Sequence, residues 1–352
     1  MTLGINIGSQ DLFVNRKVKL TCFDNRFRNG MMKMGKNKLS IGHLSTCYHS
    51  NFILMQDKNL KSQLNFEIDW HIFGTGPEMI EAFKNNELDI GYIGLPPAII
   101  GIEQGVPIKC VAGGHVEGTV MCAQMKYKDD VQLDNNVRKV MSQFKGAAIG
   151  VPAKGSIHDV ILQYYMDKYN LKDEIEVINY RQPELIALDM KKNKLEGGVG
   201  TPCLAVFAST LLESHLIIRA DNLWDNNPSY GVFFHKNLIK ENPELVLGFL
   251  TLHKKSATLL RESPDVAARL IANTVEMTTE EYVKAVLKIS PKYCIALSEG
   301  YVKSTMEFVK ALHRLEYIKR ALDIEDIFEF RFAEKIHPEP HHYVLNKKLA
   351  GL

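Results

Sequence analysis

Residues 43–49 hold the densest group of side chains in the sequence that could bind a ligand or take part in chemistry. They include His43, Ser45, Thr46, Cys47, Tyr48 and His49. The hydroxyls of Ser45 and Thr46 can donate or accept hydrogen bonds, and Tyr48 and His49 offer an aromatic wall with a donor. His43, Cys47 and His49 are also zinc or copper ligand types, but their spacing matches no specific metal motif. We therefore predict ligand contact here, with an ordinary solvated or packed loop as the alternative.

Two short segments, Thr75-Gly76 and Gly155-Ser156, each precede a predicted helix. The free N–H groups at a helix start and the positive end of the helix dipole favour an anion. We therefore predict that both segments contact a negatively charged group of a ligand. The alternative is structural, with Thr75 and Ser156 only capping their helices.

Further candidates lie where predicted strands end or cross. Gly94-Leu95 and Thr201 directly follow predicted strands whose carboxyl ends should lie at one edge of their sheets. His115 and Tyr230 lie near strands that are expected to cross between the two halves of the fold. For His115 and Tyr230, a structural role fits the sequence as well as ligand contact does. The predicted ligand-binding residues are Ser45, Thr46, Tyr48, His49, Thr75, Gly76, Gly94, Leu95, His115, Gly155, Ser156, His158, Thr201 and Tyr230. No catalytic residue, metal site or cofactor is predicted.

Several common signatures of catalysis and metal binding do not occur. The sequence has no G-x-x-x-x-G-K-[ST], no G-x-G-x-x-G and no G-x-S-x-G. Its six cysteines are scattered without a C-x-x-C pair, which argues against structural zinc and a disulfide framework and fits free thiols in a reducing compartment. His337, His341 and His342 are interpreted as part of a solvated tail rather than a metal site.

The elements that must position these residues are repeated along the chain. One copy opens with Ile41-Gly42 and carries His49; a second, about 108 residues further on, opens with Ile149-Gly150 and carries His158. Later pieces recur in the same order, with Pro77-Glu78 echoed by Pro183-Glu184 and Leu88-Asp89-Ile90-Gly91 by Leu195-Glu196-Gly197-Gly198. Because the offset is nearly constant, the series predicts an internal duplication rather than two βα units that happen to look alike.

Each copy is predicted to run strand–helix–strand–helix–strand. Strands are expected at 39–42, 68–73 and 89–93, and again at 147–151, 175–179 and 198–200. A helix is expected to begin at Ser156, with Asp159 completing a capping box. Such alternation implies parallel sheets covered by helices, with ligands at the carboxyl ends of the strands. We therefore predict an α/β protein of two duplicated βαβαβ lobes around a ligand cleft.

The predicted domain boundaries follow from this organisation. Residues 1–37 are predicted to be a poorly structured basic extension, in which Met34 could be the start. Residues 38–118 and 229–352 are assigned to lobe 1, and residues 119–228 to lobe 2. The helices expected after Asn242, including those capped by Thr278 and Ser298, are predicted to pack on lobe 1.

Composition limits the class of protein. The chain has 352 residues, of which 45% are hydrophobic and 24% charged, as expected for a soluble protein with two domains. A net charge of +2 is too small to indicate a nucleic-acid or membrane surface. No apolar run reaches the roughly 18 residues of a membrane span. The first 38 residues lack the apolar core of a secretory signal, which predicts a cytoplasmic location.

Together, these segments resemble the sulfonate, taurine and nitrate branch of ABC-transporter solute-binding proteins over roughly residues 38–290. The most specific stretch is Phe144-Lys145-Gly146 through Gly150, followed by Lys154-Gly155-Ser156-Ile157-His158. Gly76-Pro77-Glu78 supports it, whereas Gly200-Thr201-Pro202-Cys203 keeps only the proline of the family's tryptophan-rich turn. The resemblance implies a type II periplasmic-binding-protein-like fold and a small anionic organic ligand such as a sulfonate, carboxylate or phosphate ester. It also implies permease and ATPase partners and an extracytoplasmic location.

The same superfamily contains the pyrimidine-precursor synthase of thiamine biosynthesis, whose first loop is similar to Thr46-Cys47-Tyr48-His49. The positions that match its functional lysine and histidine are Ile93 and Pro97, which cannot perform that chemistry. We therefore predict a binding protein that does not transform its ligand. A cytosolic biosynthetic enzyme and a ligand-gated sensor are the alternatives.

Overall fold

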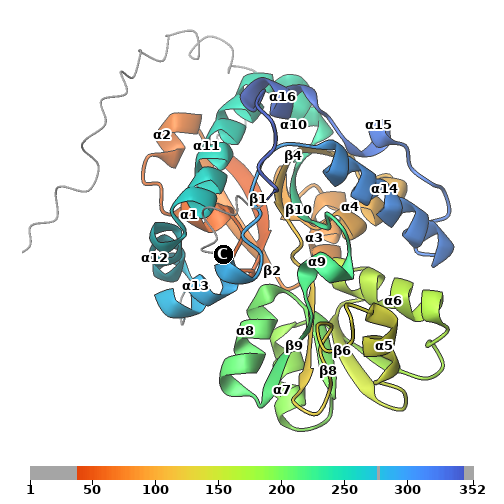
Figure 1. Cartoon of the computed structure of the whole chain (residues 1–352). Helices are drawn as coiled ribbons and strands as arrows, with labels where there is room; N and C mark the ends of the chain where they lie inside the picture. The colour runs from red at the N-terminus through yellow and green to blue at the C-terminus, as the bar shows by residue number, and fades with distance from the viewer. Residues whose placement is uncertain (1–37, 276–277, 345–352) are drawn as a thin grey trace, which may run out of the picture. The chain divides into compact units, whose positions relative to one another are not determined.

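The computed structural model describes residues 38–275 and 278–344. They form two five-stranded mixed sheets flanked by helices (Figure 1). Lobe 1 denotes the residues around the first sheet, and lobe 2 those around the second. The predicted two-lobed α/β architecture is confirmed; the predicted extension over residues 1–37 lies outside the described residues.

The first sheet has the strand order β2-β1-β3-β10-β4. Its strands are β1 (Lys38–Leu44), β2 (Glu67–Phe73), β3 (Ile90–Ile93), β4 (Ile108–Val116) and β10 (Pro228–His235). The connecting helices are α1 (Asn51–Met55), α2 (Leu60–Leu64), α3 (Gly76–Lys84) and α4 (Leu95–Glu103). Helices α3 and α4 each carry proline in their first turn, where a missing N–H breaks no helical hydrogen bond.

The second sheet has the order β7-β6-β8-β5-β9. Its strands are β5 (Val120–Gln124), β6 (Ala148–Pro152), β7 (Glu176–Tyr180), β8 (Gly197–Gly200) and β9 (Ser214–Ile218). The helices of this lobe are α5 (Val137–Ser142), α6 (Ile157–Tyr169), α7 (Glu184–Lys191), α8 (Pro202–Leu211) and α9 (Ala220–Leu223). Strand β9 was not predicted, because only its last residues form an apolar run.

The two sheets repeat the same arrangement, as the sequence duplication predicts. Ile41-Gly42 lies opposite Ile90-Gly91 in parallel register, and Ile149-Gly150 lies opposite Gly197-Gly198 in the same way. Each sheet also contains an antiparallel strand: β10 returns to the first sheet after lobe 2, and β5 enters the second sheet directly after β4. The chain therefore crosses twice between the lobes, which places the carboxyl ends of both sets of parallel strands at one cleft.

The C-terminal helices do not all stay on lobe 1. They are α10 (Lys236–Glu241), α11 (Pro243–Glu262), α12 (Pro264–Thr274), α13 (Glu280–Ile289), α14 (Glu299–Arg314), α15 (Ile324–Ile327) and α16 (Arg331–Ile336). Helices α11 and α12 pack on lobe 1 as predicted, but α13 also packs against α8, and α14 against α6. Ser298 caps α14 as predicted, whereas α13 begins one residue late and Thr279, not Thr278, caps it.

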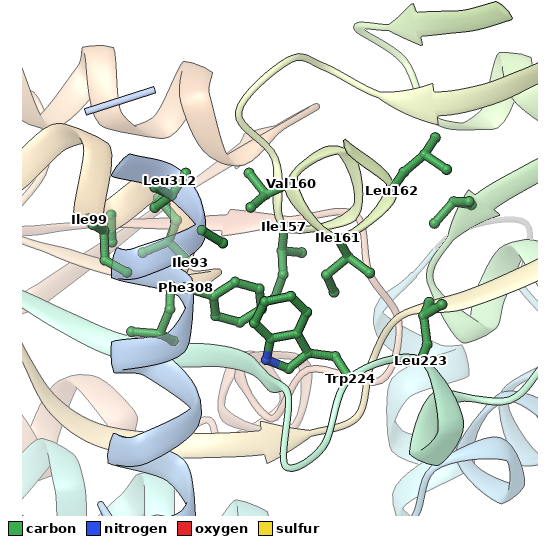
Figure 2. Close-up of a cluster of buried hydrophobic side chains, with 14 of the residues drawn as sticks. Ile93, Ile99, Ile157, Val160, Ile161, Leu162, Leu223, Trp224, Phe308 and Leu312 are labelled. Carbon is green, nitrogen blue, oxygen red and sulfur yellow. The ribbon is translucent and has the colours of Figure 1, made fainter. Parts of the chain in front are cut away.

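A hydrophobic seam joins the lobes along α6 and α14 (Figure 2). Ile157, Val160 and Ile161 of α6 face Phe308 and Leu312 of α14, with the ring of Trp224 among them. The rings of Trp224 and Phe308 stack with their centroids 4.2 Å apart. Tyr317 also donates a hydrogen bond across this seam to Asp159 Oδ2, at 2.6 Å. The seam fixes one side of the interface between the lobes and leaves the cleft on the other.

Candidate functional site

A cavity of about 190 Å³ lies between the lobes. Ten of the predicted ligand-binding residues line it: Ser45, Thr46, Tyr48, His49, Thr75, Gly76, Gly94, Ser156, His158 and Thr201. They come from both copies of the duplication, at the ends of β1, β3, β6 and β8 and at the start of α3. The structure therefore brings together residues up to about 150 positions apart in sequence. Their contact with a ligand remains a prediction.

The wall from lobe 1 begins with the loop after β1. The Tyr48 hydroxyl shares a 2.8 Å hydrogen bond with Ser229 Oγ, which fixes its ring. His49 stacks on Tyr230, with centroids 4.1 Å apart, and its Nδ1 is buried without a hydrogen-bond partner. Burial holds the pKa of His49 well below its usual value, so the ring is neutral near pH 7. A neutral imidazole in this position can offer Nδ1 to a ligand as donor or acceptor.

The start of α3 provides a second polar group on the same wall. Thr75 is the N-cap residue of α3, but its side chain accepts no hydrogen bond from the helix. Its Oγ1 is buried and has no partner, although the residue lines the cavity. Gly76 follows because a Cβ there would lie 2.6 Å from Pro97 Cγ of α4. The starts of α3 and α4 are thus packed closely beside the cavity, where Pro77, Pro96 and Pro97 have no N–H to donate.

The start of α6 provides a polar group on lobe 2. Ser156 Oγ accepts a hydrogen bond from Asp159 N at 3.2 Å, as predicted for a cap. The return bond differs from the prediction, since Asp159 Oδ2 accepts from the N–H of Gly155 at 2.8 Å. Gly155 has a φ of +82°, a conformation that favours glycine. His158 shares a 3.0 Å hydrogen bond with Thr119 Oγ1, and burial lowers the pKa of His158 to about 3.

Polar contacts cross the cleft on the side away from the seam. Ser45 Oγ donates to Glu184 Oε1 at 3.1 Å. Cys47 Sγ of lobe 1 and Cys203 Sγ of lobe 2 are 3.3 Å apart. Their hydrogen bond lowers the pKa of Cys203 and raises that of Cys47. Tyr282 of α13 donates to the Cys203 carbonyl oxygen at 2.9 Å and closes this end of the cavity.

The other four predicted residues lie outside the cavity lining. His115 is fully buried behind Tyr48, and its Nε2 lies 2.6 Å from the Ser290 carbonyl oxygen. Tyr230 supports His49 and donates to Ser50 Oγ at 3.1 Å. Gly155 shapes the start of α6, and Leu95 is buried in the first turn of α4. These residues position the wall rather than form it.

Among the lining residues that were not selected from the sequence are Glu184, Cys203, Phe207, Ser229 and Tyr282. Glu184 and Cys203 lie in or beside segments that the duplication singled out, and Ser229 directly precedes Tyr230. Including the immediate sequence neighbours of the selected residues would therefore have found all three. Phe207 lies one helical turn beyond Cys203 in α8. The sequence did not indicate Tyr282 as a lining residue, because its helix was expected to pack on lobe 1 only.

The charge of the cavity wall is low. Of the described residues that line it, Glu184 is the one carboxylate, and none is lysine or arginine. Much of the surface is apolar, with Ile157, Leu204 and Phe207 on the side of lobe 2. Four helix starts meet here, at Thr75, Gly94, Ser156 and Thr201. The arrangement is suited to holding a small organic molecule by N–H groups, hydroxyls and apolar contact.

Sequence comparisons relate the chain to a known family and to a Brucella protein. The model of the NMT1-like family matches residues 32–275. A Brucella abortus protein that carries the provisional name of a binding protein is 22% identical over 248 residues, covering 66% of this chain and 74% of its own length.

Solved structures show the same fold. The alkanesulfonate-binding protein SsuA of Xanthomonas axonopodis pv. citri, bound to MOPS, superposes with a TM-score of 0.70 at 15% identity, covering 83% of this chain and 98% of that protein. The periplasmic nitrate-binding protein NrtA of Synechocystis PCC 6803 gives 0.67 at 10% identity, covering 86% of this chain and 88% of its own. These neighbours confirm the predicted two-lobed fold.

Proposed function

This chain belongs to the NMT1-like family, and we propose that it captures a small organic ligand between its lobes and presents it to an ABC transporter without transforming it. Its structural neighbours include an alkanesulfonate-binding protein, a periplasmic nitrate-binding protein and a ligand-binding component of an ABC-type import system. The observation that carries the proposal is the cavity between the lobes, two of whose lining residues on lobe 1, Thr75 and His49, each have a buried polar atom (Oγ1 and Nδ1) with no partner in the protein. Buried polar atoms are normally hydrogen-bonded, so a ligand that supplies the missing bonds would be held firmly. No helix in the described part of the chain is long and apolar enough to cross a membrane.

We assign the ligand an anionic head group and an apolar body. The start of α6 at Ser156 can direct N–H groups at an anion without a lysine or arginine, and the dipoles of α3, α4 and α8, which have proline in their first turns, add positive potential. The apolar wall of Ile157, Leu204 and Phe207 suits an alkyl chain or small ring. An alkyl sulfonate, carboxylate or phosphate ester meets both requirements. A small inorganic anion would leave the apolar wall unoccupied.

A matched pair of compounds tests the ligand class. Butanesulfonate and butanesulfonamide have nearly the same shape, but only the first carries a charge at neutral pH. The sulfonate is expected to raise the melting temperature of the purified chain in a thermal-shift assay, because a ligand that binds only the folded state stabilises it. Mass spectrometry after incubation should return the compound unchanged. A preference for the sulfonamide would contradict the anionic head group, and conversion of the compound would favour an enzyme.

Two substitutions in α7 locate the binding site. Ala187 lines the cavity, whereas Leu188, the next residue, is 43% exposed. Ala187→Phe should fill part of the cavity and abolish the ligand-induced shift. Leu188→Phe adds an aromatic ring at a neighbouring exposed position and should leave that shift unchanged. Equal shifts in both variants would mean that the ligand binds elsewhere.

A further inference from the structure

A cluster of cysteine and histidine lies on lobe 1, outside the cavity between the lobes. Cys294 Sγ is 3.0 Å from His337 Nε2 and 3.7 Å from His342 Nδ1. The three atoms all lie within 4.8 Å of one another. Cys294 and His337 are buried, and His342 is partly exposed. The interpretation of His337 as part of a solvated tail is wrong, because the structure buries it beside Cys294, which lies 43 residues earlier.

The distances suit a transition metal. A zinc ion with its usual bond lengths and tetrahedral geometry holds a sulfur and a nitrogen ligand about 3.6 Å apart. The two sulfur–nitrogen distances here, 3.0 and 3.7 Å, lie on either side of that value. We propose that Cys294, His337 and His342 form a zinc site that fastens the C-terminal segment to lobe 1.

A carboxylate behind the cluster supports this assignment. Glu339 Oε1 lies 2.6 Å from His337 Nδ1, the ring nitrogen that faces away from Cys294. Lys254 of α11 contacts the same carboxylate oxygen at 2.5 Å and also donates to the Ile336 carbonyl oxygen. A carboxylate on the distal nitrogen of a metal-bound histidine sets its tautomer and orientation. A proton on Nδ1 would leave His337 Nε2, which lies 3.0 Å from Cys294 Sγ, free to bind a metal.

The three ligand-bearing segments are already held in place. The backbone of Cys294 is bonded to β4, since its N–H donates to the Gly114 carbonyl oxygen at 3.3 Å. His337 caps the end of α16. Next to His342, Tyr343 donates from its hydroxyl to the Cys294 carbonyl oxygen at 2.7 Å. A metal would therefore bind a site that needs little rearrangement.

The cluster opens onto a cavity that could hold a further metal ligand. A cavity of about 270 Å³ beside the cluster, lined also by Arg261 and Glu262, leaves room for water as a fourth ligand.

Cobalt and zinc titrations of the full chain test the proposal. The purified protein is stripped with a chelator and titrated with Co²⁺, which gives a thiolate-to-metal charge-transfer band when a cysteine is bound. Zn²⁺ should then displace one equivalent of Co²⁺. Cys294→Ser should remove the band, and His342→Ala should weaken zinc binding at least tenfold. His341→Ala, a change of the neighbouring exposed histidine, should leave both unchanged.

Two results would overturn the zinc site. One is a wild-type chain that shows no cobalt band and gains no thermal stability from zinc. The other is a band that survives Cys294→Ser but disappears in Cys203→Ala, which would place the metal at the thiol pair in the cleft. If Cys294→Ser does not fold, His342→Ala decides the question, because a partly exposed histidine can be truncated with less effect on the core.

Discussion

The two walls of the cavity are built from corresponding parts of a duplicated chain, yet their polar groups differ. On lobe 1, Thr75 Oγ1 and His49 Nδ1 are buried without partners. On lobe 2, Ser156 Oγ accepts from its own helix, and His158 Nδ1 is bonded to Thr119 Oγ1. A hydroxyl oxygen and a histidine Nδ1 therefore have no hydrogen-bond partner on lobe 1, whereas the same kinds of atom on lobe 2 are already hydrogen-bonded.

This difference suggests that the two lobes have different roles in ligand binding. Unpartnered buried groups destabilise the empty protein, and a ligand that bonds to them removes that cost. We therefore expect lobe 1 to supply the polar contacts that select the ligand. Lobe 2, whose polar groups are already bonded, would close over it with N–H groups and apolar contacts from Ile157, Leu204 and Phe207. The hydrophobic seam at Trp224 and Phe308 would remain in contact while the cleft opens.

The largest effect is expected from joining the two walls covalently. Cys47 and Cys203 are 3.3 Å apart across the cleft, so a mild oxidant should couple them with loss of two electrons and two protons. Oxidation with ligand bound should slow its release by more than about a hundredfold, because the lobes can no longer separate. Stopped-flow release measurements would detect this. Cys47→Ser, which cannot form the bond, should release ligand normally after the same treatment. Equally fast release from both proteins would mean that lobe 2 does not act as a lid.

Thr75→Val should produce the next largest effect. Valine has nearly the same shape but lacks the hydroxyl, so ligand affinity should fall by about ten- to a hundredfold, or roughly 1.4–2.8 kcal/mol. The empty protein should be no less stable, because Thr75 Oγ1 makes no hydrogen bond there. Calorimetric titration and thermal unfolding measure the two quantities separately. Unchanged affinity together with lowered stability would show that Thr75 is a structural residue and would remove the contrast between the walls.

The sequence predicted the repeated sheets and ten of the lining residues, because both depend on local patterns that recur along the chain. It could not distinguish Thr75 from Ser156. Both precede a helix, and only the side-chain rotamer decides whether the hydroxyl meets its own helix or the cavity. Contacts such as Cys47 with Cys203, which are 156 residues apart, depend on how the lobes face each other and carry no local signal. Tyr282 was missed for the same reason.

Acid should destabilise the protein through its buried histidines. Burial lowers the pKa of His158 to about 3 and that of His115 and His253 to about 4. The unfolded chain, with histidine pKa values near 6.5, then binds more protons than the folded chain, so the free energy of unfolding falls as pH drops below about 6.5. Each such histidine contributes about 1.4 kcal/mol per pH unit until its folded pKa is reached.

Replacing single histidines separates their contributions. His158→Gln should reduce the slope of stability against pH by about one proton between about pH 4 and 6. Urea unfolding at several pH values measures the slope. A slope that is the same in His158→Gln as in the wild type would mean that His158 is protonated in the folded protein.

Ser156→Ala should have the smallest effect. It tests directly whether the hydrogen-bonded polar groups of lobe 2 contact the ligand. Ser156 Oγ accepts from Asp159 N, so its loss should lower the free energy of unfolding by about 1 kcal/mol, as for other helix caps. Because that oxygen is already engaged, the ligand-induced rise in melting temperature should be unchanged, although the baseline is lower. Thermal-shift curves of the variant with and without butanesulfonate separate the two quantities. A reduced ligand-induced shift would mean that Ser156 also bonds to the ligand, and that lobe 2 takes part in selecting it as lobe 1 does.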